Sequence, residues 1–130
     1  MIINEVKVTE RGWAGHFICC DRCLFRRNTL LEYNDRKWVV STVGAFRNHE
    51  KKIDSIGYRR WYETKAFEAK EENGYIEADV EKEISFDSVW GIWGDSWEEV
   101  FKNCNDTPDN VANNMHDIIV NELIDKIKER

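Results

Sequence analysis

The amino-acid sequence predicts a single α+β domain that spans residues 1–130. We expect an antiparallel β-sheet of about five to six strands, with a short helix and a C-terminal amphipathic helix packed on one face. Three observations support this class. Segments rich in β-branched and aromatic residues fill the first part of the chain, turn residues separate them, and a helical apolar periodicity closes the chain.

The first predicted strands lie between residues 2 and 46. Segment 2–9 alternates apolar and polar residues, which is typical of a half-buried strand, and the run HFICC at 16–20 predicts a largely buried one. Segments 24–33 and 37–46 are predicted to form a hairpin, because the pair Asn34-Asp35 between them favours a turn.

The next predicted strands follow a polar loop at 47–55. Segment 56–69 has strong aromatic β character, and Asn73-Gly74 after it is a strong hairpin signal. In the strand beyond this turn, apolar side chains are expected inward and acidic side chains outward. The inward set is Ile76, Ala78, Val80 and Ile84, and the outward set is Glu77, Asp79, Glu81 and Glu83.

Two helices are predicted at the end of the chain, after a short Trp-rich segment at 86–93. Ser96 with Glu99 matches a capping box and predicts a short helix at 97–103. Thr107 as N-cap and Pro108 at the first helical position begin the last helix. Its apolar residues recur every four positions, at Val111, Met115, Ile119, Leu123 and Ile127.

Length and charge narrow the classes of function. A chain of 130 residues can bury a core without disulfides, and no apolar run approaches the roughly 20 residues that span a membrane. The N-terminus lacks a signal-peptide pattern, so we expect a cytoplasmic protein without a membrane partner. The net charge is −6, although 13 basic and 8 acidic residues fall within 1–67. This balance disfavours binding to extended duplex nucleic acid.

The cysteines and histidines suggest a metal site. His16-x-x-Cys19 and Cys20-x-x-Cys23 have ligand-like spacings, so His16, Cys20 and Cys23 are candidate zinc ligands. The further ligand could come from Cys104, His49 or His116. Against a metal, the second ligand pair of a structural zinc site is absent, and small buried thiols in a core are commoner.

A second hypothesis concerns binding rather than catalysis. Forked arginines suit phosphate oxygens and flat rings suit a nucleobase, and both gather on predicted strands. The candidate ligand-binding residues are Arg26, Arg27, Asn28, Thr29, Tyr58, Arg59, Arg60, Trp61 and Glu63. No Gly-x-Ser-x-Gly elbow or glycine-rich phosphate loop supports a nucleophilic or phosphate-transfer enzyme instead.

Three segments of the sequence and one triplet resemble those of a known protein family. They are RGWAGHFIC at 11–19, CLFRRNTLLEY at 23–33, VVSTVGA at 39–45 and YET at 62–64. Together they resemble a family of small phage- and prophage-encoded proteins without an assigned activity. The resemblance implies no catalytic residue. It implies a context in which a small phage protein acts in the host cytosol by binding a nucleotide signal or a host protein.

The expected function is therefore that of a non-enzymatic binding protein. It would bind a small anionic, nucleotide-like ligand or a host protein, modulate host processes such as defence, and form a homo-oligomer through aromatic surface. No cofactor other than zinc is suggested. The alternatives are a metal-dependent enzyme with a His/Cys site, and an inhibitor whose acidic strand docks to a host nucleic-acid-binding protein.

Overall fold

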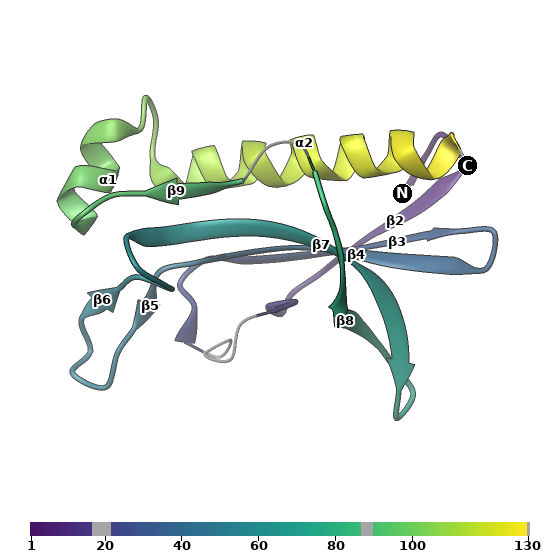
Figure 1. The fold of residues 1–130 in the computed structure, drawn as a ribbon, viewed down its shortest axis with the longest axis horizontal. Helices are drawn as coiled ribbons and strands as arrows, with labels where there is room; N and C mark the ends of the chain where they lie inside the picture. The colour runs from purple at the N-terminus through teal and green to yellow at the C-terminus, as the bar shows by residue number, and fades with distance from the viewer. Residues whose placement is uncertain (17–21, 87–89, 130) are drawn as a thin grey trace.

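A long C-terminal helix lies across one face of a seven-stranded antiparallel sheet in the computed structural model (Figure 1). The structure describes residues 1–16, 22–86 and 90–129. The predicted α+β class is confirmed. None of the helices within these residues is long and apolar enough to cross a membrane.

The sheet is a meander with one short strand added beside its longest strand. Its spatial order is β1-β2-β3-β4-β7-β8, and β9 pairs with β7. A separate pair, β5 with β6, lies off the sheet. The strands are β1 (Ile2–Ile3), β2 (Val6–Arg11), β3 (Arg26–Tyr33), β4 (Arg36–Gly44), β5 (Phe46–Arg47), β6 (Ile53–Asp54), β7 (Arg60–Glu72), β8 (Tyr75–Ile84) and β9 (Gly91–Trp93).

The two predicted hairpin turns are confirmed. Asn34 and Asp35 have φ values of 50° and 64° between β3 and β4, and Asn73 and Gly74 have 53° and 84° between β7 and β8. Two consecutive left-handed residues match the right-handed twist of the flanking strands, which is why Asn, Asp and Gly occupy these positions.

Four strand predictions need correction. The predicted strand at 2–9 is divided into β1 and β2 by a turn at Asn4 and Glu5, whose φ values are 50° and 72°. β7 begins at Arg60 rather than 56, because Arg60 N donates to Gly57 O at 3.1 Å and closes a tight turn. The predicted loop at 47–55 contains β6. Of the predicted strand at 16–20, only His16 lies in the described part, and it is outside any strand.

The alternation predicted for β8 holds only in part. Ala78 is buried as expected, but the side chain of Val80 is 62% exposed. The pairing with β7 runs from Phe67 opposite Glu83 directly to Ala69 opposite Ala78, so residues 79–82 lie opposite one residue of β7. This irregularity takes Val80 out of the sheet register and away from the core.

Both predicted helices are confirmed, as α1 (Trp97–Asn103) and α2 (Pro108–Lys128). Ser96 Oγ accepts from Glu99 N at 3.2 Å, and Thr107 Oγ1 accepts from Asn110 N at 3.2 Å. These caps satisfy amide groups that have no partner within their own helix.

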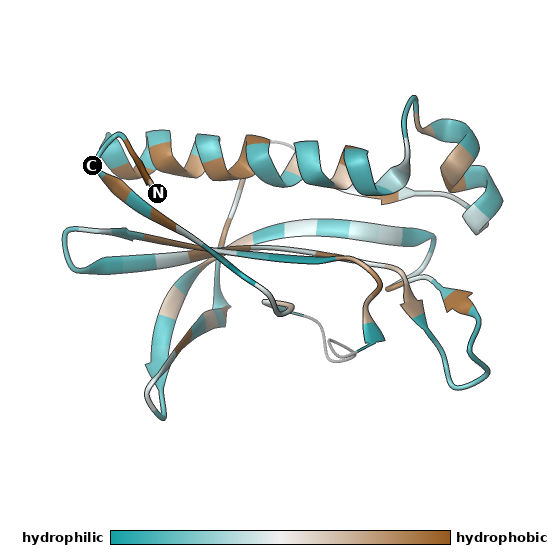
Figure 2. Ribbon diagram, turned by 180° about the vertical axis from the view of Figure 1, so that it is seen from behind, coloured by the Kyte–Doolittle hydropathy of each residue, from teal (hydrophilic) through white to brown (hydrophobic). Residues whose placement is uncertain are grey.

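The helix α2 covers one face of the sheet, and hydrophobic residues recur along its length (Figure 2). The principal hydrophobic core lies between α2 and this face of the sheet. It contains Val6, Val8, Leu31, Trp38, Val40, Ala66, Ile119, Val120, Leu123, Ile124 and Ile127. On the other face, which we call the far face, the β7–β8 hairpin and the β5–β6 pair project away from α2 (Figure 1).

The far face has two smaller apolar clusters. One contains Leu30, Val39, Phe67 and Ala78, and the other contains Cys23, Val43 and Ile56. On β4, Ser41 lies between the positions that belong to these two clusters, Val39 and Val43. The polar site described next therefore occupies a gap between two apolar patches.

Candidate functional site

A buried chain of hydrogen bonds links three side chains on the far face. His16 Nδ1 lies 2.7 Å from Ser41 Oγ, and His16 Nε2 lies 2.8 Å from Glu63 Oε1. Ser41 comes from β4 and Glu63 from β7, which pair directly, whereas His16 comes from the segment after β2. The antiparallel register places the serine and the carboxylate diagonally opposite each other, and the imidazole bridges them.

Glu63 is the anionic end of this chain. Burial by itself would raise the pKa of Glu63, but the hydrogen bond from His16 and the charges of His16, Arg60 and Lys65 lower it below its usual range. Arg60 Nε lies 2.9 Å from the second carboxylate oxygen, Glu63 Oε2. The carboxylate is therefore ionised at neutral pH and held between two cationic or donor groups.

The order Ser–His–Glu resembles that of a nucleophilic triad, but the serine is inaccessible. Ser41 has 0% of its surface exposed, and its Oγ also accepts from Gly15 N at 3.1 Å. A Cβ added to Gly15 would lie 2.6 Å from Ser41 Cβ, so the backbone of this segment packs directly on the serine. A substrate carbonyl has no approach to Oγ, and the arrangement serves to hold residues 15 and 16 on the sheet.

Two clefts flank the His16–Glu63 pair. The β9 cleft lies on the Glu63 side, and the hairpin cleft lies on the His16 side beside the β7–β8 hairpin. Each has a volume of about 310 Å³, which reaches the lower end of the range for small-molecule sites. The β9 cleft is lined by Arg60, Glu63, Thr64, Lys65, Glu83, Ile84, Ser85, Phe86, Trp90 and Trp93. The hairpin cleft is lined by Trp13, Ala14, Gly15, His16, Asn28, Lys70, Glu77, Ala78 and Val80.

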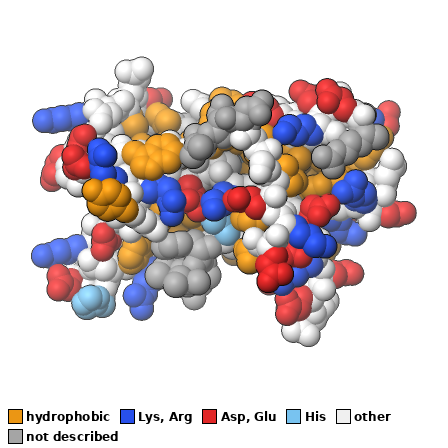
Figure 3. Space-filling view, viewed as in Figure 1, with side chains coloured by type: hydrophobic (Ala, Val, Ile, Leu, Met, Phe, Trp, Pro, Cys, Tyr) orange, Lys and Arg blue, Asp and Glu red, His pale blue; other side chains and the backbone are white. Residues whose placement is uncertain are grey.

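The β9 cleft combines charges with aromatic rings. Lys65 Nζ forms an ion pair with Glu83 Oε1 at 3.1 Å, beside the pair of Arg60 and Glu63. Basic and acidic side chains alternate across the middle of the side of the molecule that Figure 3 shows, next to hydrophobic ones. Trp90 lies at the edge of the cleft, where its carbonyl oxygen accepts from Thr64 N at 3.1 Å.

A second polar network lies on the opposite face, between the sheet and α2. His116 has 0% of its surface exposed, and its two ring nitrogens each lie 2.7 Å from a threonine hydroxyl, of Thr29 and of Thr42. Thr29 in turn donates to Glu10 Oε1 at 2.7 Å. Arg27 donates to the same Glu10 oxygen at 2.5 Å and to Asp117 Oδ1 at 2.8 Å.

The predicted ligand-binding residues do not form one site. Arg27 and Thr29 belong to the network beneath α2, whereas Asn28 lines the hairpin cleft, and Arg60 and Glu63 line the β9 cleft. Neighbouring residues of a strand point to opposite faces, so a run such as 26–29 is divided between them.

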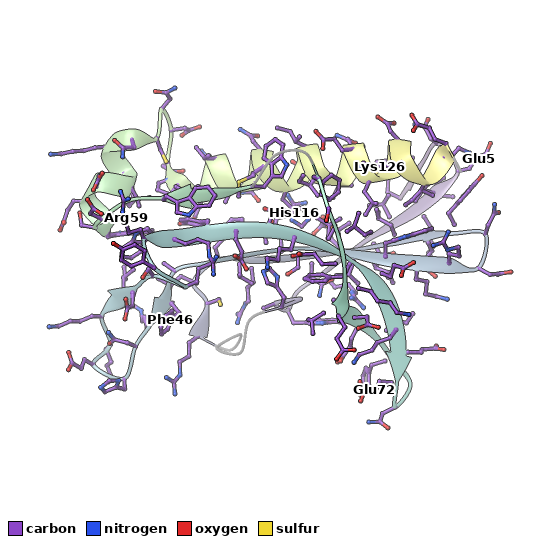
Figure 4. All side chains as sticks on the ribbon, viewed as in Figure 1. Glu5, Phe46, Arg59, Glu72, His116 and Lys126 are labelled. Atoms are coloured by element: carbon purple, nitrogen blue, oxygen red, sulfur yellow. The ribbon has the colours of Figure 1, made fainter. Side chains whose placement is uncertain are left out.

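The remaining predicted ligand residues lie apart from both clefts. Tyr58 is 93% exposed, and Arg59 forms an ion pair with Asp95 at 2.5 Å. Trp61 is buried, and its Nε1 donates to Gly94 O at 2.9 Å. Arg26 is exposed at the start of β3. Figure 4 shows Arg59 at the α1 end of the molecule, far from the middle of α2.

The proposed zinc ligands are described only in part. Cys20 lies outside the described residues, as does Cys19. Cys23 is buried with Val43 and Ile56, and both ring nitrogens of His16 have protein partners. Within residues 1–16, 22–86 and 90–129, no group of three or more His, Cys, Asp or Glu side chains is placed to hold a metal ion.

Several site residues carry no signal that sequence reasoning used. Ser41 and Lys65 are ordinary strand residues, and Trp90 belongs to a segment noted only for its tryptophans. His116 alone had a usable signal, because it follows Met115 on the apolar stripe of α2 and a histidine there is expected to find polar partners. Comparison with family models, with curated proteins and with solved structures finds no match to this chain.

Proposed function

We propose that the protein binds a small anionic ligand in the β9 cleft. The observation that carries this proposal is a buried donor, Trp90 Nε1, that makes no hydrogen bond to any described residue. Trp90 lines this cleft together with the cations Arg60 and Lys65. A buried donor left without an acceptor costs about 1–3 kcal/mol, so Trp90 Nε1 calls for an acceptor from outside the chain.

The charges of the cleft favour an anionic acceptor. Arg60 Nε is paired with Glu63 Oε2 at 2.9 Å, and Lys65 supplies a second positive charge in the same cleft. The ion pair of Lys65 with Glu83 is about half exposed. Such a pair contributes at most about 1 kcal/mol, so a ligand carboxylate or phosphate can take the place of Glu83.

The rest of the cleft favours a ligand with a flat or apolar body. Phe86, Trp90 and Trp93 surround the charged groups, and the volume of about 310 Å³ admits one ring with its anionic substituent. Aromatic side chains bury a large apolar area, and a planar ligand can stack on them. The proposed ligand class is therefore a small aromatic anion, of which a nucleotide is one example.

Binding of three anions by the purified protein tests this proposal. We expect isothermal titration calorimetry to show saturable binding of benzoate and adenosine monophosphate, and weaker binding of inorganic phosphate, which has no ring. Replacing Trp90 with Phe keeps an aromatic ring but removes the N–H donor, and should weaken binding about tenfold. Lys65→Gln should weaken it similarly.

Lys52→Gln is the control, because this exposed lysine is paired with Glu50 and lines neither cleft. It should leave binding unchanged. The proposal fails if none of the three anions binds and native mass spectrometry shows no retained small molecule. It also fails if Trp90→Phe and Lys65→Gln both bind like the wild type. The metal-dependent enzyme and the acidic docking strand stay predictions from the sequence.

A further inference from the structure

We propose that the hairpin cleft is a second binding site, which takes a flat, uncharged heteroaromatic ring with a hydrogen-bond acceptor at one edge. This inference is independent of the β9 cleft, because the two clefts share no lining residue. It depends on three features of the hairpin cleft: a buried amide at its floor, an aromatic ring at its wall and opposite charges at its rim.

The amide of Asn28 supplies unused donors. Arg11 Nε donates to Asn28 Oδ1 at 3.1 Å, and an arginine can only donate, so the oxygen must face Arg11 and the amide nitrogen must face away from it. Nδ2 then lies beside Gly15, where a Cβ would be 3.4 Å from it. Asn28 is only 1% exposed and lines the cleft, yet Nδ2 makes no hydrogen bond to a described residue.

Arg11 is held firmly enough to orient that amide. Besides the bond to Asn28, Arg11 Nη1 donates to Ile76 O at 2.5 Å. These two bonds tie the arginine of β2 to β3 and to the β7–β8 hairpin, which forms one wall of the cleft. The donor direction of Asn28 is therefore set by the fold rather than by free rotation of the amide.

Trp13 supplies a stacking surface. Its side chain is 50% exposed, and the guanidinium of Arg11 lies 4.7 Å from the centroid of its ring. The arginine occupies one face of the indole as a cation–π contact, so the exposed part of the ring is free to stack on a ligand. A planar ring gains most from such a surface, and base–aromatic stacking does not depend on the identity of the base.

The rim favours an uncharged ligand over an anion. Lys70 and Glu77 are directly opposite each other on the β7–β8 hairpin and both line the cleft. Their charges offset each other, and Lys70 Nζ also lies 3.4 Å from Glu72 Oε2. The carboxylate of Glu77 can accept a hydrogen bond, and the ammonium of Lys70 can donate one. The edge of a nucleobase-like heterocycle carries both donors and acceptors, so it can bind to both groups.

Titration with four uncharged nucleosides tests this site. We expect adenosine, guanosine, cytidine or uridine to quench tryptophan fluorescence saturably, because a ring stacks on Trp13. In Trp13→Ala the affinity measured by equilibrium dialysis should fall about tenfold or more. Asn28→Asp keeps an acceptor for Arg11 but removes both amide donors, and should weaken binding by a similar factor.

Phe101→Ala is the matched control, since Phe101 is 48% exposed but lines neither cleft. It should bind nucleosides like the wild type. Trp13→Ala removes a half-exposed side chain, so it remains informative even if the buried Asn28→Asp change prevents folding. The proposal is overturned if no nucleoside binds at millimolar concentration, if Trp13→Ala binds like the wild type, or if Phe101→Ala loses binding.

Discussion

His116 is a buried histidine, and its hydrogen-bond partners determine which of its two ring nitrogens carries the proton. Thr29 donates its hydroxyl proton to Glu10, so its oxygen must accept from His116 Nε2–H. His116 Nδ1 then accepts from Thr42, whose hydroxyl lies 2.7 Å from that of Thr64. The two ring nitrogens of His116 and the hydroxyls of Thr29 and Thr42 therefore all have partners while the ring is neutral. Figure 4 shows His116 between the helix and the sheet.

The neutral state of His116 makes stability depend on pH. Burial, together with the charge of Arg27, lowers the pKa of His116 from its ordinary value of 6.5 to about 3. Below pH 6.5 the unfolded chain binds a proton at this position and the folded chain does not, so stability falls as pH falls towards 3. The expected slope is up to about 1.4 kcal/mol per pH unit.

Urea unfolding at pH 6.5 and pH 5 checks this prediction. In His116→Gln the free energy of unfolding should change less over this interval than in the wild type. His49→Gln is the control, because His49 is exposed and its replacement should leave the wild-type slope in place. An unchanged slope in His116→Gln would show that another group is responsible.

Glu63 makes stability depend on pH in the same sense, over a lower pH range. Its pKa is lowered in the folded state, so it contributes stability above the pKa of an unfolded glutamate, and this contribution is lost as pH falls through the lower folded value. Glu63→Gln loses the charge that faces His16 and Arg60 and should destabilise the fold by about 1.5–3 kcal/mol at pH 7. The difference from the wild type should shrink below pH 4, and a constant difference would contradict the linkage.

At the scale of strands and helices, the sequence predicted the turns and helix ends that depend on the chemistry of neighbouring residues. The turns at Asn34-Asp35 and Asn73-Gly74 follow from residues that accept positive φ, and the start of α2 at Thr107-Pro108 follows from capping. The later start of β7 and the exposure of Val80 could not be predicted in this way. The tight turn of residues 57–60 sets the start of β7, and the irregular pairing of β8 with β7 exposes Val80.

The start of α2 is also tied to the sheet by a tertiary bond. Tyr62 on β7 donates its hydroxyl to Asp109 Oδ1 at 2.8 Å, and burial together with this bond raises the pKa of Tyr62. Tyr62→Phe should lower the free energy of unfolding by about 1 kcal/mol and increase amide hydrogen exchange in the first turns of α2. Tyr75→Phe, on an exposed tyrosine, should change neither measurement.

At the scale of the molecule, α2 joins two apolar clusters on one face of the sheet. Its C-terminal half packs in the principal core through Leu123 and its neighbours. Its N-terminal half packs with Trp61 and Val100 through Ala112 and Met115. A single rigid helix that crosses both clusters couples their unfolding.

Leu123→Ala tests this coupling. The change should cost about 2–5 kcal/mol, because Leu123 is almost fully buried. Near-ultraviolet circular dichroism, which reports the tryptophans of both clusters (Trp38 in the principal core and Trp61 in the other), should shift by the same amount as the far-ultraviolet signal. Two separated transitions would show that the clusters unfold independently. Ile118→Ala, on the exposed side of α2, should have a much smaller effect.

The sequence predicted some residues of the candidate site but not their arrangement. The sequence singled out Asn28, Arg60, Glu63 and His16 as chemically suited residues, and the structure divides them between two clefts, with His16 and Asn28 in one and Arg60 and Glu63 in the other. It could not predict that Arg27 and Thr29 turn towards α2, because the parity of a strand does not say which face a helix will cover.

Sequence by itself determined the local structure of this protein: the α+β class, the hairpin turns, both helix caps and the apolar stripe of α2. These follow from backbone preferences and short-range periodicity, which a chain carries wherever it folds. Only the tertiary structure decided which face α2 covers, and hence that Ser41 is sealed beneath Gly15 while Trp90 and Asn28 keep unused donors beside clefts. Those features depend on contacts between residues far apart in the chain, whose geometry no local pattern encodes.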